Sequence, residues 1–315
     1  MFRRDNSAVI QEYLAKFSHL QAFHDPILFN HLNDIGFIPE LYAIPWVLTM
    51  FAHVFPLQNI YHLWDKVRLN INLLCKCHTH YKFLFQLLLG NASFPLCVAL
   101  AILQQLRSRL LEAEFNDCIL LFSDLPAIDI EQCVNDSIRV FCATPKSLTY
   151  RKHAFDNGKD PLDEKVTTSP DLTLEDITLE MQRSDKVPRI SGEELLALLG
   201  LKAMNDNSDR HFRQTKAVAV DVRPNSEYKK SALPNCPNIP LEGAFGEDGE
   251  LLVNHEALQI GKQKKSKVIC LIGSMHTMDA KIFAEKLLRL NFHRVCFLHK
   301  GIEIFKHNIL IVPNT

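Results

Sequence analysis

The stretch KVICLIGSMHTMDAKIFAEKLLRLNFHRVCFL, residues 267–298, decides the fold class of the second part of the chain. It contains two short apolar runs with β-branched residues, at 267–272 and 294–298, which are typical of buried strands. Between them, residues 279–290 space their apolar and charged side chains as an amphipathic helix does. Because neighbouring parallel strands need a helical crossover, this order predicts a parallel α/β sheet.

Two segments extend this prediction toward the amino terminus. AVAVDV, residues 217–222, is a third run of the same kind. ISGEELLALL, residues 190–199, contains a capping box, in which Glu194 follows Ser191 by three residues, and this pattern predicts the start of a helix. We therefore expect residues 188–310 to form an α/β domain.

Residues 151–187 have a different texture, because they are polar and charged, with few aromatic side chains and no sustained period. Such a segment cannot bury enough apolar area to offset the entropy of ordering it. We interpret it as a flexible linker that has room for one short helix around residues 172–181.

Residues 1–150 are expected to be all helix. The first helix begins behind an N-cap candidate at Asn6 or Ser7. Its apolar face consists of Val9, Tyr13, Leu14 and Phe17. A second helix starts at Pro95, and its leucines share one face: Leu96, Leu100, Leu103, Leu106 and Leu110. The third, within 128–141, aligns Ile130, Val134, Ile138 and Phe141.

Composition limits the kinds of partner and compartment. The 315 residues are 47% hydrophobic, enough for roughly two domains, and carry 35 basic and 36 acidic side chains. This balance gives no bulk attraction to nucleic acid or anionic membrane. The lysine-rich residues 261–267 are interpreted as a solvated turn, and no nucleic-acid partner is expected. The nine scattered cysteines and the absence of a signal sequence or spanning segment favour the cytoplasm.

One family resemblance lies in DVRPNSEYKKSALPNCPNIP, residues 221–240, which is similar to the first signature of rhodanese-like domains. The fitting positions are Asp221, Arg223, Glu227, Tyr228, Pro234, Asn238, Ile239 and Pro240. Ser231 and Ala232 stand where that family has Gly-His. Residues 291–305 resemble the closing segment of the family, with Lys300 in place of one glycine.

The resemblance implies a nucleophilic cysteine in a loop that follows the central strand, where backbone N–H groups stabilise a thiolate and then a persulfide. The nucleophile position falls on Gly273, which offers no thiol. A weaker alternative is Cys270, but it lies within an apolar strand, and no Arg or Lys follows it in the loop. His276 is expected to be an exposed loop histidine. We therefore expect a pseudo-rhodanese, a fold kept for binding.

The helical part resembles the second half of a TBC domain, the domain of Rab GTPase-activating proteins. The landmarks are the Pro-x-x-Tyr-x-x-x-Trp segment that ends at Trp46, the Trp-Asp pair at Trp64 and Asp65, and the leucine-rich helix after Phe94. The fold class is therefore multidomain: an all-α TBC-type half-domain followed by an α/β rhodanese-like domain. Both tryptophans are expected in the core.

For activity, the TBC resemblance implies an arginine from an Ile-x-x-Asp-x-x-Arg motif and a glutamine from a Tyr-x-Gln-Gly motif. Neither motif occurs in this sequence. We expect a fragment or short isoform that does not accelerate GTP hydrolysis alone and needs no cofactor. The implied partners are a Rab GTPase and the protein subunits of a trafficking complex, in the cytoplasm or peripherally on endosomes.

A cluster of potential metal ligands interrupts the TBC resemblance. Cys75, Cys77, His78 and His80 lie within six residues, but this spacing is too close for one tetrahedral zinc site. Removing Val67–Gln86 restores the Trp-Asp to Leu-Leu-Leu-Gly-Asn spacing of the resembled family. The residues at the two ends of the segment can be encoded by codons that contain a splice donor and a splice acceptor. We interpret the segment as a retained intron or an error of the gene model, and predict that most transcripts lack it.

Overall fold

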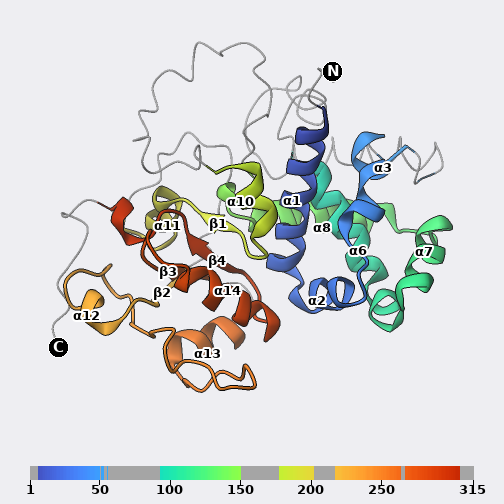
Figure 1. The fold of residues 1–315 in the computed structure, drawn as a ribbon. Coiled ribbons are helices and arrows are strands. Elements are labelled where there is room, and N and C mark those ends of the chain that lie inside the picture. Colours follow the sequence, from blue (N-terminus) through green and yellow to red (C-terminus); the bar gives the residue numbers. More distant parts are fainter. Residues whose placement is uncertain are drawn as a thin grey trace, which may run out of the picture. The chain divides into compact units, whose positions relative to one another are not determined.

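The computed structural model describes residues 6–49, 51–52, 55, 93–149, 177–201, 217–263 and 267–305 (Figure 1). The chain divides into two compact units, which we call the helical unit and the sheet unit. The helical unit comprises Met1–Gln21, Ile27–Thr144 and Asn207–Phe212. The sheet unit comprises Ala22–Pro26, Pro145–Asp206 and Arg213–Thr315.

The helical unit is built from the amphipathic segments that the sequence predicts. Its elements are α1 (Asn6–His24), α2 (Pro26–Asp34), η1 (Pro39–Leu41), α3 (Ala43–Leu48), α6 (Phe94–Glu112), α7 (Phe115–Ser123) and α8 (Ile130–Ala143). The all-helical prediction is confirmed for the described residues of this unit.

Helix α6 is the centre of the helical unit. It begins with Pro95 in its first turn, and the five leucines of the predicted face are all buried. Its length and its mean hydropathy of 1.2 would suit a membrane span, but 67% of that window is buried inside the protein. Burial of this extent is expected of a core helix.

Helix α8 packs against α6, and polar contacts fix where it begins. The Asp129 side chain accepts a hydrogen bond from the Gln132 backbone at 3.0 Å, as an N-cap does. The Gln105 side chain from α6 bonds both the N–H (3.0 Å) and the carbonyl (2.8 Å) of Asp129. Ile130, Val134 and Ile138 are buried, as their spacing predicts.

The sheet unit alternates helices and strands. Its elements are α9 (Lys146–Thr149), α10 (Leu179–Ser184), β1 (Arg189–Ile190), α11 (Gly192–Leu198), β2 (Ala217–Asp221), α12 (Asn225–Tyr228), α13 (Glu256–Gln263), β3 (Val268–Ile272), α14 (Asp279–Arg289), β4 (Val295–Leu298) and η3 (Ile302–Ile304). The strands are parallel and lie in the order β1-β4-β3-β2. The predicted parallel sheet is confirmed.

Helices cover both faces of this sheet. Successive side chains of a strand point to opposite faces. Cys270 and Ile272 of β3 therefore share a core with Leu195 of α11. Ile269 and Leu271 face the other side, where α13 and α14 contact the strands. Figure 1 shows α11 on one side of the sheet and α13 and α14 on the other.

The end of the predicted linker is packed into the sheet unit. Asp185, just after α10, bonds Arg189 Nε at 2.6 Å and Lys281 Nζ of α14 at 2.8 Å. Its side chain is 1% exposed, and Val187 is buried. These contacts hold α10 and the short strand β1 against α14. Most of the predicted linker, residues 151–176, lies outside the described residues.

The predicted capping box of α11 forms only in part. The Ser191 side chain accepts from the Glu194 backbone at 3.3 Å, as an N-cap should. The Glu194 carboxylate does not return to the Ser191 backbone. It accepts instead from the backbone N–H groups of Lys146 (2.6 Å) and Ser147 (2.8 Å) at the start of α9. Glu194 therefore caps a neighbouring helix rather than its own.

Candidate functional site

The candidate site is the loop between β3 and α14, where rhodanese enzymes would carry their nucleophile. β3 ends at Ile272, and Gly273 is the first residue after it. A Cβ atom added to Gly273 would lie 2.8 Å from the Ala280 Cβ and 3.3 Å from the Ala280 nitrogen in the first turn of α14. A contact of 2.8 Å between two carbons is far inside their optimal separation. The position has no room for a cysteine as the chain stands.

A carboxylate of the same chain binds this loop. Glu303, from η3, accepts from the Ser274 hydroxyl at 2.5 Å and from the Met275 backbone N–H at 3.0 Å. The His276 N–H donates to the Ser274 hydroxyl at 3.3 Å. At least one backbone N–H of this loop, that of Met275, therefore binds an anion that the chain itself supplies.

Close backbone approach brings η3 to the loop. Gly301 adopts φ 63°, and a Cβ there would lie 2.5 Å from the Met275 nitrogen. The Ile302 N–H donates to the Gly273 carbonyl at 2.9 Å. Lys300, which replaces a glycine of the family pattern, also has a positive φ of 61°. Only Gly301 meets the loop so closely that a side chain would collide with it.

Cys270, the weaker candidate nucleophile, lies in the middle of β3. Its side chain is fully buried, and its register partner on β4 is Cys296. Burial raises the pKa of the Cys270 thiol well above its usual range, and the neighbouring Cys296 raises it further. The thiolate is the reactive form of cysteine. His276 is exposed in the loop, so it does not share the buried surroundings of this thiol.

This environment predicts slow alkylation of Cys270 in the native protein. Iodoacetamide should modify Cys142, which is exposed, much faster than Cys270, because the buried thiol stays protonated and out of contact with reagent. The extent of labelling at each cysteine is measured by peptide mass spectrometry, with urea-unfolded protein as the control in which the rates converge. Comparable native rates at both positions would contradict the assignment.

Asp221 and Arg223 of the rhodanese signature form a buried ion pair. Arg223 Nη2 lies 2.8 Å from Asp221 Oδ2, and Nε lies 3.1 Å from Oδ1. Arg223 Nη2 also donates to the Ser231 carbonyl at 2.6 Å. Burial raises the pKa of the Asp221 carboxyl, and the hydrogen bonds from Arg223 oppose this rise. The pair ties the end of β2 to the loop that follows it.

Other signature residues complete the same tie. The Asn238 side-chain amide donates to the carbonyls of Asp221 (3.1 Å) and Arg223 (2.9 Å). The Tyr228 hydroxyl donates to the Cys236 carbonyl at 2.8 Å. Glu227 and Pro240, the remaining predicted site residues of this motif, are half-buried. The contacts of this motif join the end of β2 to the loop that follows it, so the motif has a structural role here.

In the helical unit, Trp46 is a core residue. It is 3% exposed, and its ring lies 5.4 Å from Phe122 and 5.6 Å from Tyr42 between centroids. The Tyr42 hydroxyl accepts from the Gln21 side chain at 2.5 Å. Aromatic pairs at these distances stabilise a core beyond their buried area. Trp46 therefore packs α3 and the preceding Tyr42 against α7.

Several predicted residues lie outside the described part of the chain. They are Trp64, Asp65, Cys75, Cys77, His78 and His80, together with the rest of the predicted insertion Val67–Gln86. Among the residues that the structure does describe, no cluster of His, Cys, Asp and Glu is arranged to hold a metal ion. The insertion and the choice between a zinc site and none stay predictions.

The sequence reasoning missed Glu303 and the Asp185 contacts. Glu303 acts across 28 and 29 residues on Met275 and Ser274, and Lys281 reaches back 96 positions to Asp185. Spacing rules relate residues within one helix or strand, so they contain no signal for such pairs. The sequence signal closest to the Glu303 contact is Gly301, a glycine two residues before this acidic residue, which permits a close approach of the backbone.

Comparisons with known protein families match the two parts of the chain separately. The family model of the Rab-GTPase-TBC domain matches residues 1–111, and that of the rhodanese-like domain matches residues 204–308. The chain joins a TBC region to a rhodanese-like domain. This order of the TBC region and the rhodanese-like domain is the one that the sequence motifs predict.

Two of the similar proteins match nearly the whole chain, and a third matches less than half of it. The TBC domain-containing protein kinase-like protein of Mus musculus is 43% identical over 99% of this chain, and its Dictyostelium discoideum namesake is 25% identical over 98%. TBC1 domain family member 5 of Homo sapiens is 27% identical over 43% of the chain. The chain spans about a third of the mouse relative (35%).

Proposed function

We infer that this chain is a non-catalytic scaffold of the Rab-GAP family, whose rhodanese-like domain binds protein partners and performs no sulfur transfer. The single observation that carries this inference is the loop after β3. Gly273 has no room for a side chain, and Glu303 already accepts from the Met275 N–H and the Ser274 hydroxyl of the loop. The chemistry of a rhodanese needs both a thiolate and an open anion site at this loop.

A Rab GTPase is the proposed partner of the TBC region, in support of vesicle traffic on or near endosomes. The match to the Rab-GTPase-TBC domain over residues 1–111 supports this partner. Stimulation of GTP hydrolysis requires an arginine and a glutamine finger, and this sequence contains neither motif. An arginine finger contributes about 10³–10⁵ in rate, so binding without acceleration is the expected behaviour.

A single-turnover GTPase assay tests this proposal directly. A panel of purified Rab proteins loaded with GTP is mixed with the chain at saturating concentration, and phosphate release is followed. We expect rates within about twofold of each Rab alone, because no group of this chain neutralises charge on the transferring phosphoryl. Acceleration of about 10³-fold for any Rab would overturn the proposal.

Two alternatives predict different results. If the activity belongs to a longer chain that carries both finger motifs, that chain accelerates hydrolysis where this one does not. If the domain is a sulfurtransferase, transfer of sulfur from thiosulfate to cyanide should occur and should vanish in Cys270→Ser. We expect no sulfur transfer by the wild-type chain or by the Cys270→Ser variant, because Cys270 is fully buried and its thiol stays protonated.

A further inference from the structure

The candidate loop and the start of α14 expose three large apolar side chains within eight residues of one another. Met275 is 54% exposed, Met278 is 63% exposed and Ile282 is 42% exposed. Met278 and Ile282 are four residues apart, so they lie on one face across the first turn of α14. Large apolar side chains scattered singly need no explanation, but a group of neighbours on one surface marks an interaction site. We call these three residues the Met–Ile stripe.

An acidic hairpin lies against the same helix. Phe245 and Leu251 pair as an antiparallel bridge. The Phe245 ring lies 4.8 Å from the Phe283 ring of α14 and 4.7 Å from Lys286 Nζ. Since Lys286 follows Ile282 by one helical turn, the hairpin flanks the Met–Ile stripe. Its charged residues are all acidic and exposed: Glu242, Glu247, Asp248 and Glu250.

Helix α14 contains three basic residues, Lys281, Lys286 and Arg289. Arg289 is exposed and lies two helical turns beyond Ile282, toward the end of the helix and away from Met275 and Met278. Lys281 bonds Asp185 at 2.8 Å and the Ser184 carbonyl at 3.1 Å, so its charge is paired at the end of α10. Lys286 lies over the face of Phe245. Between Leu241 and Gln259 the sequence contains no lysine or arginine. The surroundings of the stripe therefore favour a positively charged partner.

We propose that the Met–Ile stripe is a docking surface for an amphipathic helix with basic side chains, supplied by a protein partner. The proposal rests on the scaffold function above and adds the site and the chemistry of one partner. Methionine side chains are flexible and polarisable, so they adapt to an apolar helix face. Residues at i and i+4 on α14 form a ridge that packs into the groove of a second helix. Basic residues on the flank of that helix would meet the acidic hairpin.

Other occupants fit the charges less well. A second copy of this chain would bring a second acidic hairpin to the interface, and like charges brought together oppose association. An anionic lipid surface would be repelled by the same hairpin. The candidate loop offers no open anion site either, because Glu303 binds the Met275 N–H. A basic helix is the occupant that matches both the apolar and the charged features.

The test uses the full chain and two synthetic peptides. Both are 18-residue amphipathic helices with the same leucine face, and one carries lysine where the other carries glutamate. Binding is measured by fluorescence anisotropy in about 0.1 M salt, where surface charges still act over about 10 Å. We expect the lysine peptide to bind at least about tenfold more tightly than the glutamate peptide, a difference of about 1.4 kcal/mol.

Variants locate the site. Met278→Gln with Ile282→Gln removes the apolar surface without adding charge, and it should weaken binding of the lysine peptide by about tenfold or more. The matched control is Leu120→Gln, which removes a 69% exposed leucine from α7 in the helical unit and should change binding by less than about twofold. Amide hydrogen exchange of the wild type with peptide should show added protection within 274–289.

Three results would overturn the proposal. They are equal binding of the two peptides, undiminished binding by the Met278→Gln, Ile282→Gln variant, and no binding of either peptide. Concentration-dependent dimerisation that the same variant abolishes would assign the stripe to a second copy instead. These outcomes are separate from the scaffold proposal, because failure of peptide binding leaves the GTPase and sulfur-transfer results unchanged.

Discussion

Placing a thiol at the predicted nucleophile position by Gly273→Cys is expected to destabilise the sheet unit and to leave sulfur transfer undetectable. The new Cβ would lie 2.8 Å from the Ala280 Cβ, so α14 has to shift or the loop has to distort. Overpacking of this kind costs about 1–3 kcal/mol. The cost is steric, because Gly273 is not among the residues with positive φ.

Activity should stay absent even where the variant folds. A thiolate at position 273 would stand near the Glu303 carboxylate, and the loop contains no arginine or lysine to stabilise it. A nearby negative charge disfavours the thiolate and repels an anionic sulfur donor. The free energy of unfolding is measured with urea, and sulfur transfer is measured with thiosulfate and cyanide.

The double variant Gly273→Cys, Ala280→Gly is the control for this mechanism. Ala280→Gly alone should cost about 1 kcal/mol because glycine is a poor helix former. In the double variant the 2.8 Å contact between the two Cβ atoms is absent and only the 3.3 Å approach to the backbone nitrogen of residue 280 remains, so its cost should be clearly smaller than the sum of the single costs. Strict additivity would show that Ala280 is not the obstacle. Efficient sulfur transfer by either cysteine variant would contradict the expectation that Glu303 keeps this loop inactive.

The substitution Arg223→Ala is expected to have the largest effect on stability. It leaves the Asp221 carboxylate unpaired at 0% exposure and also removes a hydrogen bond to the Ser231 carbonyl. Removing one partner of a buried ion pair costs about 3–5 kcal/mol, because the other charge stays buried. The expected result is a sheet unit that unfolds at much lower urea concentration.

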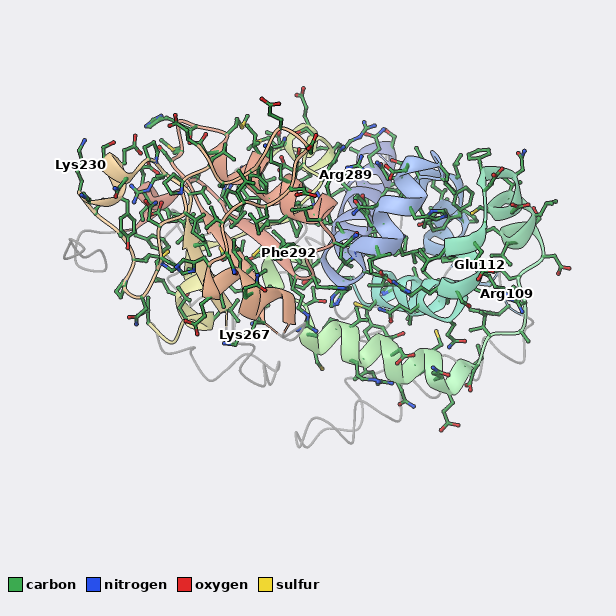
Figure 2. All side chains as sticks on the ribbon, turned by 90° about the horizontal axis from the view of Figure 1, so that it is seen from below. Arg109, Glu112, Lys230, Lys267, Arg289 and Phe292 are labelled. Carbon is green, nitrogen blue, oxygen red and sulfur yellow. The ribbon has the colours of Figure 1, made fainter. Side chains whose placement is uncertain are left out.

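Lys230→Ala is the matched control in the same loop. Lys230 follows α12, is exposed, and points away from the sheet unit (Figure 2). Lys230→Ala removes the same positive charge as Arg223→Ala. We expect it to change the free energy of unfolding by no more than about 0.5 kcal/mol. The comparison separates loss of the buried ion pair from a general effect of charge. A double variant Asp221→Asn, Arg223→Met should recover part of the loss, because no charge is then left buried. Equal effects of Arg223→Ala and Lys230→Ala would contradict the structural role of the pair.

The sheet unit was predictable where local pattern and tertiary structure agree. β2, β3 and β4 are short β-branched runs, and α14 has helical periodicity, so each could be located from the sequence. β1 could not, because Arg189 and Ile190 form a strand of two residues that exists only through pairing with β4. A strand this short has no period of its own.

The candidate site was predictable in position but not in detail. Counting back from α14 located Gly273, because the loop length between a strand and a helix is a local property. The contacts of Glu303 and Glu194 were not predictable, since each side chain acts on backbone groups more than 25 positions away in the sequence. Glu194 shows the limit clearly, because a local rule assigned it to its own helix and tertiary structure placed it on another.

The carboxylate of Glu303 has a consequence for competition with dissolved ligands. Because it belongs to the same chain as the loop, it acts at the effective concentration of a tethered group, on the order of millimolar. A free anion with the same intrinsic affinity for the Met275 N–H would have to exceed that concentration before it displaced Glu303. Glu303 therefore competes with any dissolved anion for the Met275 N–H, and we expect the loop to bind such anions weakly.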